Sequence, residues 1–274
     1  MNMLAPSKRK SVIAALVEGM GVNATARLTG VSKPTVLKVL AQVGCACAAY
    51  HNDHVRGLRP ARVECDETWG FVHCKQKNVR SAKSMVYGAG DCYTWIAVDR
   101  DTKLIISYLI GQRTGGDAVT FMDDLAGRVI NLDQLTTDGF NGYPDAVKAA
   151  FGNEVNYGQL IKQYRVVPAG SETRYFPASC VGCTKQSVIG FPDPMYMSTS
   201  IVERVNLTLR MHNRRMTRLT NAHSKKLENH GHAIALFFLY CNYCRGHETL
   251  KGKTPAQAAR LSNHRWAIDE LHGH

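Results

Sequence analysis

The chain has 274 residues, with 34 Lys or Arg against 22 Asp or Glu and a formal net charge of +12. Hydrophobic residues make up 45% and charged residues 20%, near the globular average, which excludes wholesale disorder. The excess of cations indicates a polyanionic partner, either nucleic acid or an anionic membrane surface. The longest apolar stretch, 233–241, is about half the length that spans a bilayer, so nucleic acid is favoured.

Cysteine usage indicates the compartment. The chain contains nine cysteines, an odd number that argues against a full disulfide framework. Residues 1–6 lack the apolar region of a signal peptide, so we expect a reducing environment. We therefore predict a cytoplasmic protein of prokaryotic type, associated with the nucleoid through DNA.

Residues 1–43 predict three short helices. Apolar residues recur at helical spacing from Val12 to Met20, and a second short helix follows Asn23. Gly30 allows a tight turn, after which Ser32 is placed to cap a third helix. Two helices joined by a short glycine-containing turn are typical of a helix-turn-helix, whose second helix enters the major groove of DNA.

The third helix carries the candidate recognition residues, Lys33, Thr35 and Lys38. The alternative is a plain three-helix bundle with exposed lysines. Residues 44–61 are expected to form a linker to the next domain.

Residues 62–260 predict an α/β domain. Strands are expected at 62–72, 93–98 and 103–110, then a helix at 116–129, a short strand ending at Asp138 and a helix at 143–151. This is the order of a ribonuclease H-like core, a mixed sheet flanked by helices. Residues 162–198 are expected to be an irregular insertion, 199–219 a helix and 261–274 a C-terminal tail.

Three carboxylates are candidate metal ligands. Asp66 lies in a strand otherwise suited to burial, where a carboxylate is costly unless it binds something. Asp138 stands at a strand end, where ligands collect in open α/β sheets, although Asp-Gly is also ordinary turn chemistry. Glu203, on the polar face of a helix, could bind a metal or pair with neighbouring arginines. Strand alternation directs Glu67 away from Asp66, so we expect only one of these two in the site.

If the three acids converge, they could hold two Mg²⁺ or Mn²⁺ ions, which prefer oxygen ligands. Two such ions about 4 Å apart activate water or a 3′-hydroxyl and stabilise the leaving oxygen in phosphoryl transfer. Four rival acids are set aside, because they fit a hairpin turn or an exposed helix face: Asp99, Asp101, Asp123 and Asp124.

Several segments resemble the motifs of DDE transposases, above all the insertion-sequence-one group. The acidic motifs are Cys-Asp-Glu-Thr-Trp at 65–69, Thr-Thr-Asp-Gly at 136–139 and Ser-Thr-Ser-Ile-Val-Glu-Arg-Val-Asn at 198–206. The basic run 210–226 and Asn-Tyr-Cys-Arg-Gly-His at 242–247 resemble that group's later segments. Cys241 stands where the closing signature has Tyr, and no cysteine-rich zinc finger precedes the predicted helix-turn-helix. The resemblance covers the chain to about residue 260.

The resemblance implies that Asp66, Asp138 and Glu203 form a metal-binding catalytic triad. The implied enzyme cuts transposon ends, at their terminal inverted repeats, and joins the 3′-hydroxyl to target DNA. A homodimer or larger assembly is expected, because two DNA ends must be held together. The cations expected along the DNA are Arg204, Arg210, Arg214, Arg215, Arg218, Lys225 and Lys226. The alternatives are a DNA-binding regulator that has lost the chemistry and a stand-alone metal-dependent nuclease.

Two Cys-x-x-Cys pairs suggest zinc at first sight. They are too far apart in sequence for a compact zinc ribbon, and Cys241 and Cys244 lie on an apolar run where cysteine packs as a small hydrophobe. Zinc is therefore not expected, and Cys180 and Cys183 are the better candidates if it binds.

Overall fold

A computed structural model describes residues 4–81, 86–164, 180–217 and 220–272. Its centre is a six-stranded mixed sheet in the order β3-β2-β1-β4-β5-β6. Strands β1, β2 and β3 form an antiparallel meander, β4 runs parallel to β1, β5 runs parallel to β4, and β6 is antiparallel to β5. The strands are β1 (Arg62–Val72), β2 (Gly90–Asp99), β3 (Ile105–Gly111), β4 (Gln134–Asp138), β5 (Asn156–Tyr164) and β6 (Cys180–Ile189).

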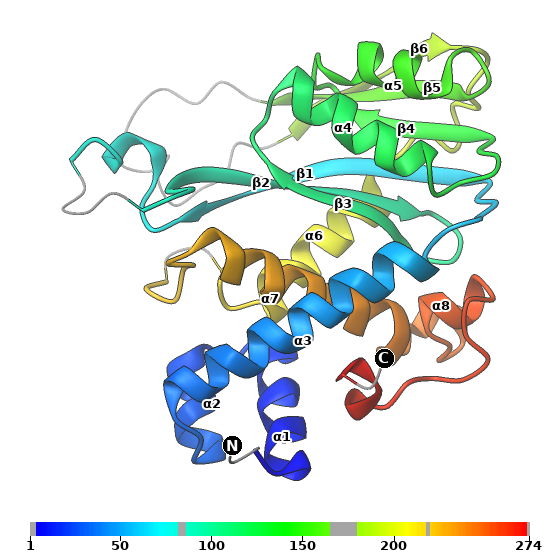
Figure 1. Cartoon of the computed structure of the whole chain (residues 1–274). Coiled ribbons are helices and arrows are strands. Elements are labelled where there is room, and N and C mark those ends of the chain that lie inside the picture. The colour runs from blue at the N-terminus through cyan, green and yellow to red at the C-terminus, as the bar shows by residue number, and fades with distance from the viewer. Residues whose placement is uncertain (1–3, 82–85, 165–179, 218–219, 273–274) are drawn as a thin grey trace.

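This topology confirms the predicted α/β class and the ribonuclease H-like order of elements. Helices α4 (Gly115–Ala126) and α5 (Tyr143–Phe151) follow β3 and β4 and cover one face of the sheet (Figure 1). Trp95 of β2 packs there against Phe121 and Tyr143, with ring centroids 5.7 and 5.5 Å apart. β1 lies between β2 and β4, so a side chain on β1 has a strand on either side of it.

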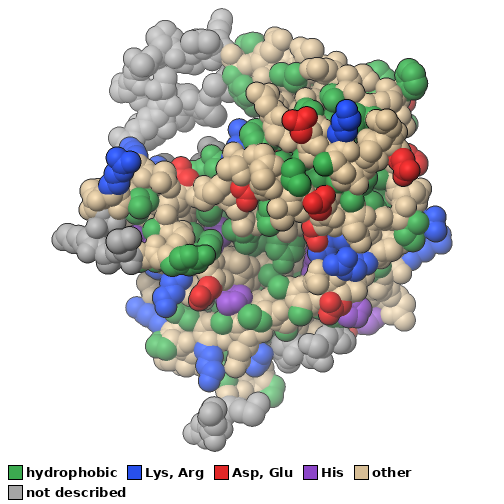
Figure 2. Space-filling view, turned by 45° about the horizontal axis from the view of Figure 1, so that its top comes forward, with side chains coloured by type: hydrophobic (Ala, Val, Ile, Leu, Met, Phe, Trp, Pro, Cys, Tyr) green, Lys and Arg blue, Asp and Glu red, His purple; other side chains and the backbone are tan. Residues whose placement is uncertain are grey.

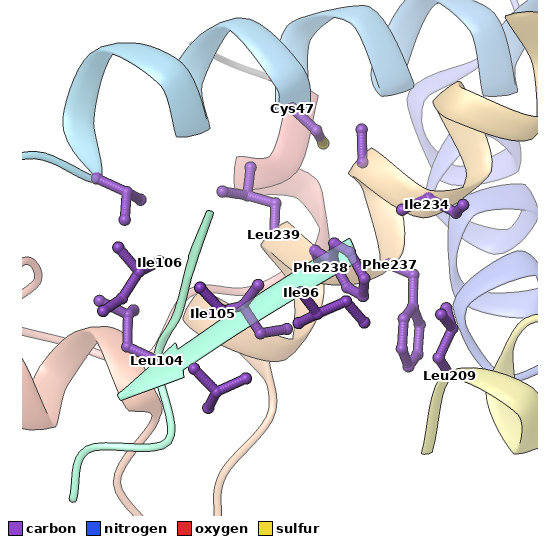
Figure 3. Close-up of a cluster of buried hydrophobic side chains, with 14 of the residues drawn as sticks. Cys47, Ile96, Leu104, Ile105, Ile106, Leu209, Ile234, Phe237, Phe238 and Leu239 are labelled. Atoms are coloured by element: carbon purple, nitrogen blue, oxygen red, sulfur yellow. The ribbon is translucent and has the colours of Figure 1, made fainter. Parts of the chain in front are cut away.

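The opposite face is covered by α6 (Ser200–His212), α7 (Leu227–Leu239) and the long α3 (Lys33–His54) (Figure 1). Figure 3 shows the apolar side chains buried between these layers, among them Ile96 and Ile105 from the sheet and Phe238 from α7. Gly44 lies where α3 meets α7: an added Cβ would lie 2.5 Å from that of His232. The glycine therefore lets these two helices come close.

The three expected N-terminal helices are present as α1 (Pro6–Val17), α2 (Val22–Thr29) and α3. The predicted turn is confirmed, because Gly30 has φ +67° and the Ser32 side chain accepts a hydrogen bond from the backbone of Thr35. The linker expected at 44–61 begins too early. Residues 44–54 instead continue α3, because their apolar side packs against α7.

The C-terminal half needs two further corrections. Within the insertion expected at 162–198, residues 180–189 form β6, while 165–179 lie outside the described residues. The tail expected at 261–274 is packed, since Trp266 is buried 4.4 Å from the ring of Tyr243. The remaining elements of the C-terminal half are a π-helix (Tyr240–Cys244), α8 (Pro255–Ala258) and 3₁₀ turns at Glu248–Leu250 and Ile268–His272. One more 3₁₀ turn, Gln76–Asn78, follows β1.

Within the described part of the chain, none of the helices combines the length and the apolar character needed to cross a membrane.

Candidate metal centre and nucleic-acid interface

Asp66 lies on the central strand β1 and points toward α6. The buried side chain of Asn206 donates from Nδ2 to Asp66 Oδ2 over 2.8 Å. This bond fixes the carboxylate because Asn206 belongs to α6, a helix packed on the sheet.

Asp138 is brought beside Asp66 by strand pairing. β4 runs parallel to β1, with Thr137 opposite Cys65, so the next residue on each strand carries a carboxylate. Asp138 Oδ1 accepts from the backbone of Phe140 over 3.0 Å, which fixes the turn after β4. The predicted position at a strand end is therefore confirmed.

Glu67 joins this group, contrary to expectation. Asp66, Glu67 and Asp138 each offer one carboxylate oxygen, and these three atoms lie within 4.8 Å of one another. Alternation does direct Glu67 to the other face of β1, toward Arg113 and Tyr143. The structure therefore brings both neighbouring acids of β1 close to Asp138, where the prediction expected only one of them.

Glu203 lies beside the group but outside its tightest part. Its Oε1 contacts Lys162 Nζ of β5 and accepts from Thr199 Oγ1 at the start of α6. Glu203 is near enough to Asp66 to raise the pKa of that carboxyl. The structure therefore brings the three predicted acids to one end of the sheet, with Lys162 as a counterion.

Burial raises the pKa values of the clustered acids, and repulsion adds to the rise for two of them. Burial, then the charge of Asp138, raises the pKa of Asp66 to about 7. The same two causes raise the pKa of Glu67, 1% exposed, to about 8. Burial also raises the pKa of Asp138. Close carboxylates that resist ionisation favour a cation, and an all-oxygen donor set fits Mg²⁺ or Mn²⁺.

Arg113 is the cation within the group that sequence reasoning missed. Its Nη2 lies 3.0 Å from Asp138 Oδ2 and its Nε lies 3.5 Å from Glu67 Oε2. The guanidinium also lies 4.7 Å from the centre of the Phe140 ring. Nothing in the sequence pattern singles out Arg113 or Lys162, whereas Glu67 and Asn206 lie inside the motifs quoted above.

The rival acids mostly behave as expected. Asp99 Oδ1 accepts from the backbone of Asp101 over 2.9 Å, as in a turn, and Asp123 is exposed on α4. Asp124, expected on the same exposed face, is instead half-buried, because Arg128 pairs with both of its oxygens.

The candidate recognition residues lie at the start of α3. Lys33 and Lys38 are exposed, as DNA contact requires. Thr35 is partly buried and its hydroxyl lies 2.8 Å from that of Ser32.

The second set of cations divides into four groups, of which Arg215 forms the last. Arg204, Arg214, Lys225 and Lys226 are exposed. Arg210 Nη2 donates to Thr68 Oγ1 of β1 over 2.6 Å, so this side chain is directed to the sheet. Arg218 lies outside the described residues.

Arg215 is directed more toward the interior than its neighbours. Burial lowers its pKa, and Nη1 lies 3.5 Å from the Oγ of the fully buried Ser224. No sequence pattern predicts this, because Arg215 is one of several adjacent cations and α6 ends before it, at His212.

The exposed cations after α6 lie beside the N-terminal helices α1–α3. Arg214, Lys225 and Lys226 line a cavity of about 390 Å³ together with Met20 and Leu37 of the N-terminal helices. Figure 2 shows that on the face in view Lys and Arg side chains form no continuous patch, being separated by acidic and apolar ones.

The cysteine pairs differ in burial. Cys180 and Cys183 are exposed, with their sulfurs 3.9 Å apart. Cys244 is buried and contacts the carbonyl of Ala267, which confirms that it packs in the interior.

No protein-family model matches this sequence, and no curated protein sequence matches it. The solved structures that are similar in outline include two complexes. One is a simian T-cell lymphotropic virus intasome in complex with PP2A regulatory subunit B56 gamma, with 17% identity, 94% of this chain and 76% of that chain covered, and a TM-score of 0.36. The other is a piggyBac transposase synaptic complex with hairpin DNA, with 9% identity, coverages of 98% and 69%, and a TM-score of 0.38.

Proposed function

We propose that this chain is a DDE-type DNA transposase, which cleaves transposon ends and joins the 3′-hydroxyl to target DNA by metal-dependent phosphoryl transfer. The observation that carries the proposal is the pairing of β1 with β4, which sets Asp66 beside Asp138 while α6 brings Glu203 to the same end of the sheet. These three acids are the ones the transposase motifs single out.

In this proposal Asp66, Asp138 and Glu203 hold divalent cations. Mg²⁺ or Mn²⁺ bound there would activate the attacking oxygen and stabilise the leaving one. Asn206 keeps the Asp66 carboxylate in place through its 2.8 Å hydrogen bond. Lys162 holds Glu203 at the group, and Arg113 partly neutralises Asp138 and Glu67 while the acids stand close together.

We place the DNA contacts on two sets of cations, one in the N-terminal helices and one in and after α6. Residues 1–43 would recognise the terminal inverted repeat through Lys33, Thr35 and Lys38, while residues 62–260 carry the chemistry. Arg204, Arg214, Lys225 and Lys226 are exposed, so they are available to phosphates of the transposon or target duplex. Two ends must be joined in one event, so the active species would be a homodimer or larger.

The test is a strand-transfer assay. Duplexes from the flanks of the coding sequence, with a pre-cut 3′ end, are incubated with protein, plasmid and Mn²⁺. We expect joined products from the wild type and none from Asp66→Asn, Asp138→Asn or Glu203→Gln. The control is Asp123→Asn, which removes an exposed carboxylate on α4 and should leave joining unchanged.

The same assay distinguishes the alternatives. Metal-dependent cleavage without joined products would make the chain a nuclease. Duplex binding with no covalent product, unchanged by Asp66→Asn, would make it a regulator. Either outcome would overturn the transposase proposal.

A further inference from the structure

The exposed cysteine pair lies at an edge of the sheet. Among the described residues β6 is the last strand of the sheet and pairs with β5 alone, and it is exposed over most of its length. Cys180 and Cys183 are three residues apart on this strand. In a regular strand residues with that spacing point to opposite faces, so two thiols would not meet.

A bulge brings the two thiols together. Tyr164 pairs with Cys180 but Gln163 pairs with Gly182, so Val181 is an extra residue on β6. An extra residue resets the alternation of a strand and re-aims the side chain beside it. The sulfurs of Cys180 and Cys183 therefore lie 3.9 Å apart on the same side.

This separation matches two ligands of one metal ion. In a tetrahedral zinc site with Zn–S bonds of about 2.3 Å, neighbouring sulfurs are about 3.8 Å apart. The 3.9 Å between Cys180 and Cys183 is close to that edge of the tetrahedron. The two thiols are thus already arranged as half of a zinc coordination sphere.

The other half is not offered by the described part of one chain. Among the described residues, the set of three or more metal-ligating side chains is the acidic one on β1 and β4, which does not include these cysteines. Residues 165–179, which precede Cys180, contain neither Cys nor His in their sequence. A second copy of the chain, related by two-fold symmetry, would supply the same two thiols.

The surface around the thiols suits such a partner. Val181, between the cysteines, is 63% exposed, and Tyr164 beside Cys180 is 56% exposed. Phe191, just after β6, is 96% exposed. Apolar side chains on an open strand edge are normally covered, because such an edge otherwise pairs with other chains.

We propose that Cys180 and Cys183 are ligands of a zinc ion shared by two copies of the chain, in a four-cysteine site that joins their β6 edges. On binding, four thiols lose four protons and four Zn–S bonds form, so the step needs no oxidant or reductant. Cys183 pairs across the strands with Lys162 of β5, which contacts Glu203, so β5 alone would separate the dimer interface from the nearest strand of the candidate acidic centre. The inference does not depend on the proposed DNA chemistry.

The test uses the full chain, reduced and stripped of metal, then titrated with Zn²⁺ while metal content and molecular mass are measured. We expect one zinc per two chains and a doubling of mass on zinc addition. Co²⁺ in place of zinc should give a thiolate-to-metal charge-transfer band. Cys180→Ser and Cys183→Ser should each lose all three effects and, being exposed, should keep the unfolding temperature of the wild type.

The matched control is Cys45→Ser, which removes another exposed thiol, 3.2 Å from His232 Nε2, and should leave zinc binding unchanged. One zinc per chain, a mass unaffected by zinc, or zinc binding that survives Cys180→Ser would each overturn the proposal. So would a Cys180–Cys183 disulfide that persists under the reducing conditions of the titration.

Discussion

Replacing Asp66 by Asn should stabilise the metal-free protein while weakening its response to divalent cations. Asn has nearly the same shape and its Oδ1 can still accept from Asn206, so the 2.8 Å contact is kept. What is lost is a carboxylate that burial and Asp138 hold at a pKa of about 7, against an ordinary value of 3.8.

The sign follows from proton binding. The folded chain keeps the Asp66 proton up to a pKa of about 7, whereas the unfolded chain releases it near 3.8, so wild-type stability falls as pH rises between these values. At pH values above both pKa values, a shift of this size lowers the unfolding free energy of the wild type by roughly 4 kcal/mol. Solvent at the open edge of the site reduces this loss to about 2–4 kcal/mol. Near pH 4 the unfolded chain also holds the proton for a large part of the time, so the difference should fall below about 1 kcal/mol.

The assay is urea unfolding of wild type and Asp66→Asn at pH 4 and pH 8, with EDTA or Mn²⁺. In EDTA at pH 8 the variant should be more stable; at pH 4 the two should agree to within about 1 kcal/mol. Mn²⁺ at about 100 times its dissociation constant should add roughly 2.7 kcal/mol to the wild type, because it binds only the folded state, and less to the variant. A variant less stable than wild type in EDTA at pH 8, or a difference independent of pH, would refute the reasoning.

Three further predictions concern the scaffold and are measured by urea unfolding at fixed pH unless stated. Gly44→Ala should lower the free energy of unfolding by about 1–3 kcal/mol, because the added Cβ would meet His232. The control Gly115→Ala, with no neighbour within 4 Å of the added Cβ, should change it by less than about 1 kcal/mol. Equal effects would refute the close contact of α3 with α7. Arg128→Leu should lower the free energy of unfolding by about 3–5 kcal/mol. The half-buried Asp124 carboxylate and the carbonyls of His51 and Val55 would lose their hydrogen-bond donor. Burial lowers the pKa of His51 from 6.5 to about 4, so the stability of the wild type should fall as the pH drops from 6.5 to 4. Over this range the difference in unfolding free energy between wild type and His51→Gln should grow by up to about 3 kcal/mol. A difference that does not vary between pH 7 and pH 4 would contradict this prediction.

The elements that depend on local pattern were predicted from the sequence. β1 has the predicted bounds, 62–72, and Asp138 ends β4 as expected, because alternating apolar residues and turn chemistry are read directly from neighbouring residues. The predicted turn at Gly30 is present for the same reason.

The misread elements depend on partners distant in sequence. Residues 44–54 lack the charge that marks an isolated helix, and they are helical because α7, almost two hundred residues later, packs on them. β6 reads as irregular because its exposed residues carry no alternation of apolar and polar side chains, and its pairing with β5 defines it.

The site shows the same division. Asp66, Asp138 and Glu203 could be chosen from their motifs, but their distances could not, since each comes from a different element. Glu67 was set aside by a sound rule about alternation, which says where a side chain points and not what approaches it from the neighbouring strand. Arg215 was counted with its neighbours because a run of cations does not reveal which of them turns inward.

The acidic group stands out because it works against the stability of the fold. Asp66, Glu67 and Asp138 are mostly buried, with one carboxylate oxygen of each within 4.8 Å of the others. Burial raises all three pKa values, and the charge of Asp138 adds to the rise for Asp66 and Glu67. The charges of Arg113 and Lys162 lower these pKa values only in part. A group needed only for folding would be more stable with an amide in place of at least one carboxylate, which is why the Asp66→Asn experiment separates the two roles. If the free protein gains stability and loses its response to Mn²⁺ together, the cost of the group is the cost of holding a cation.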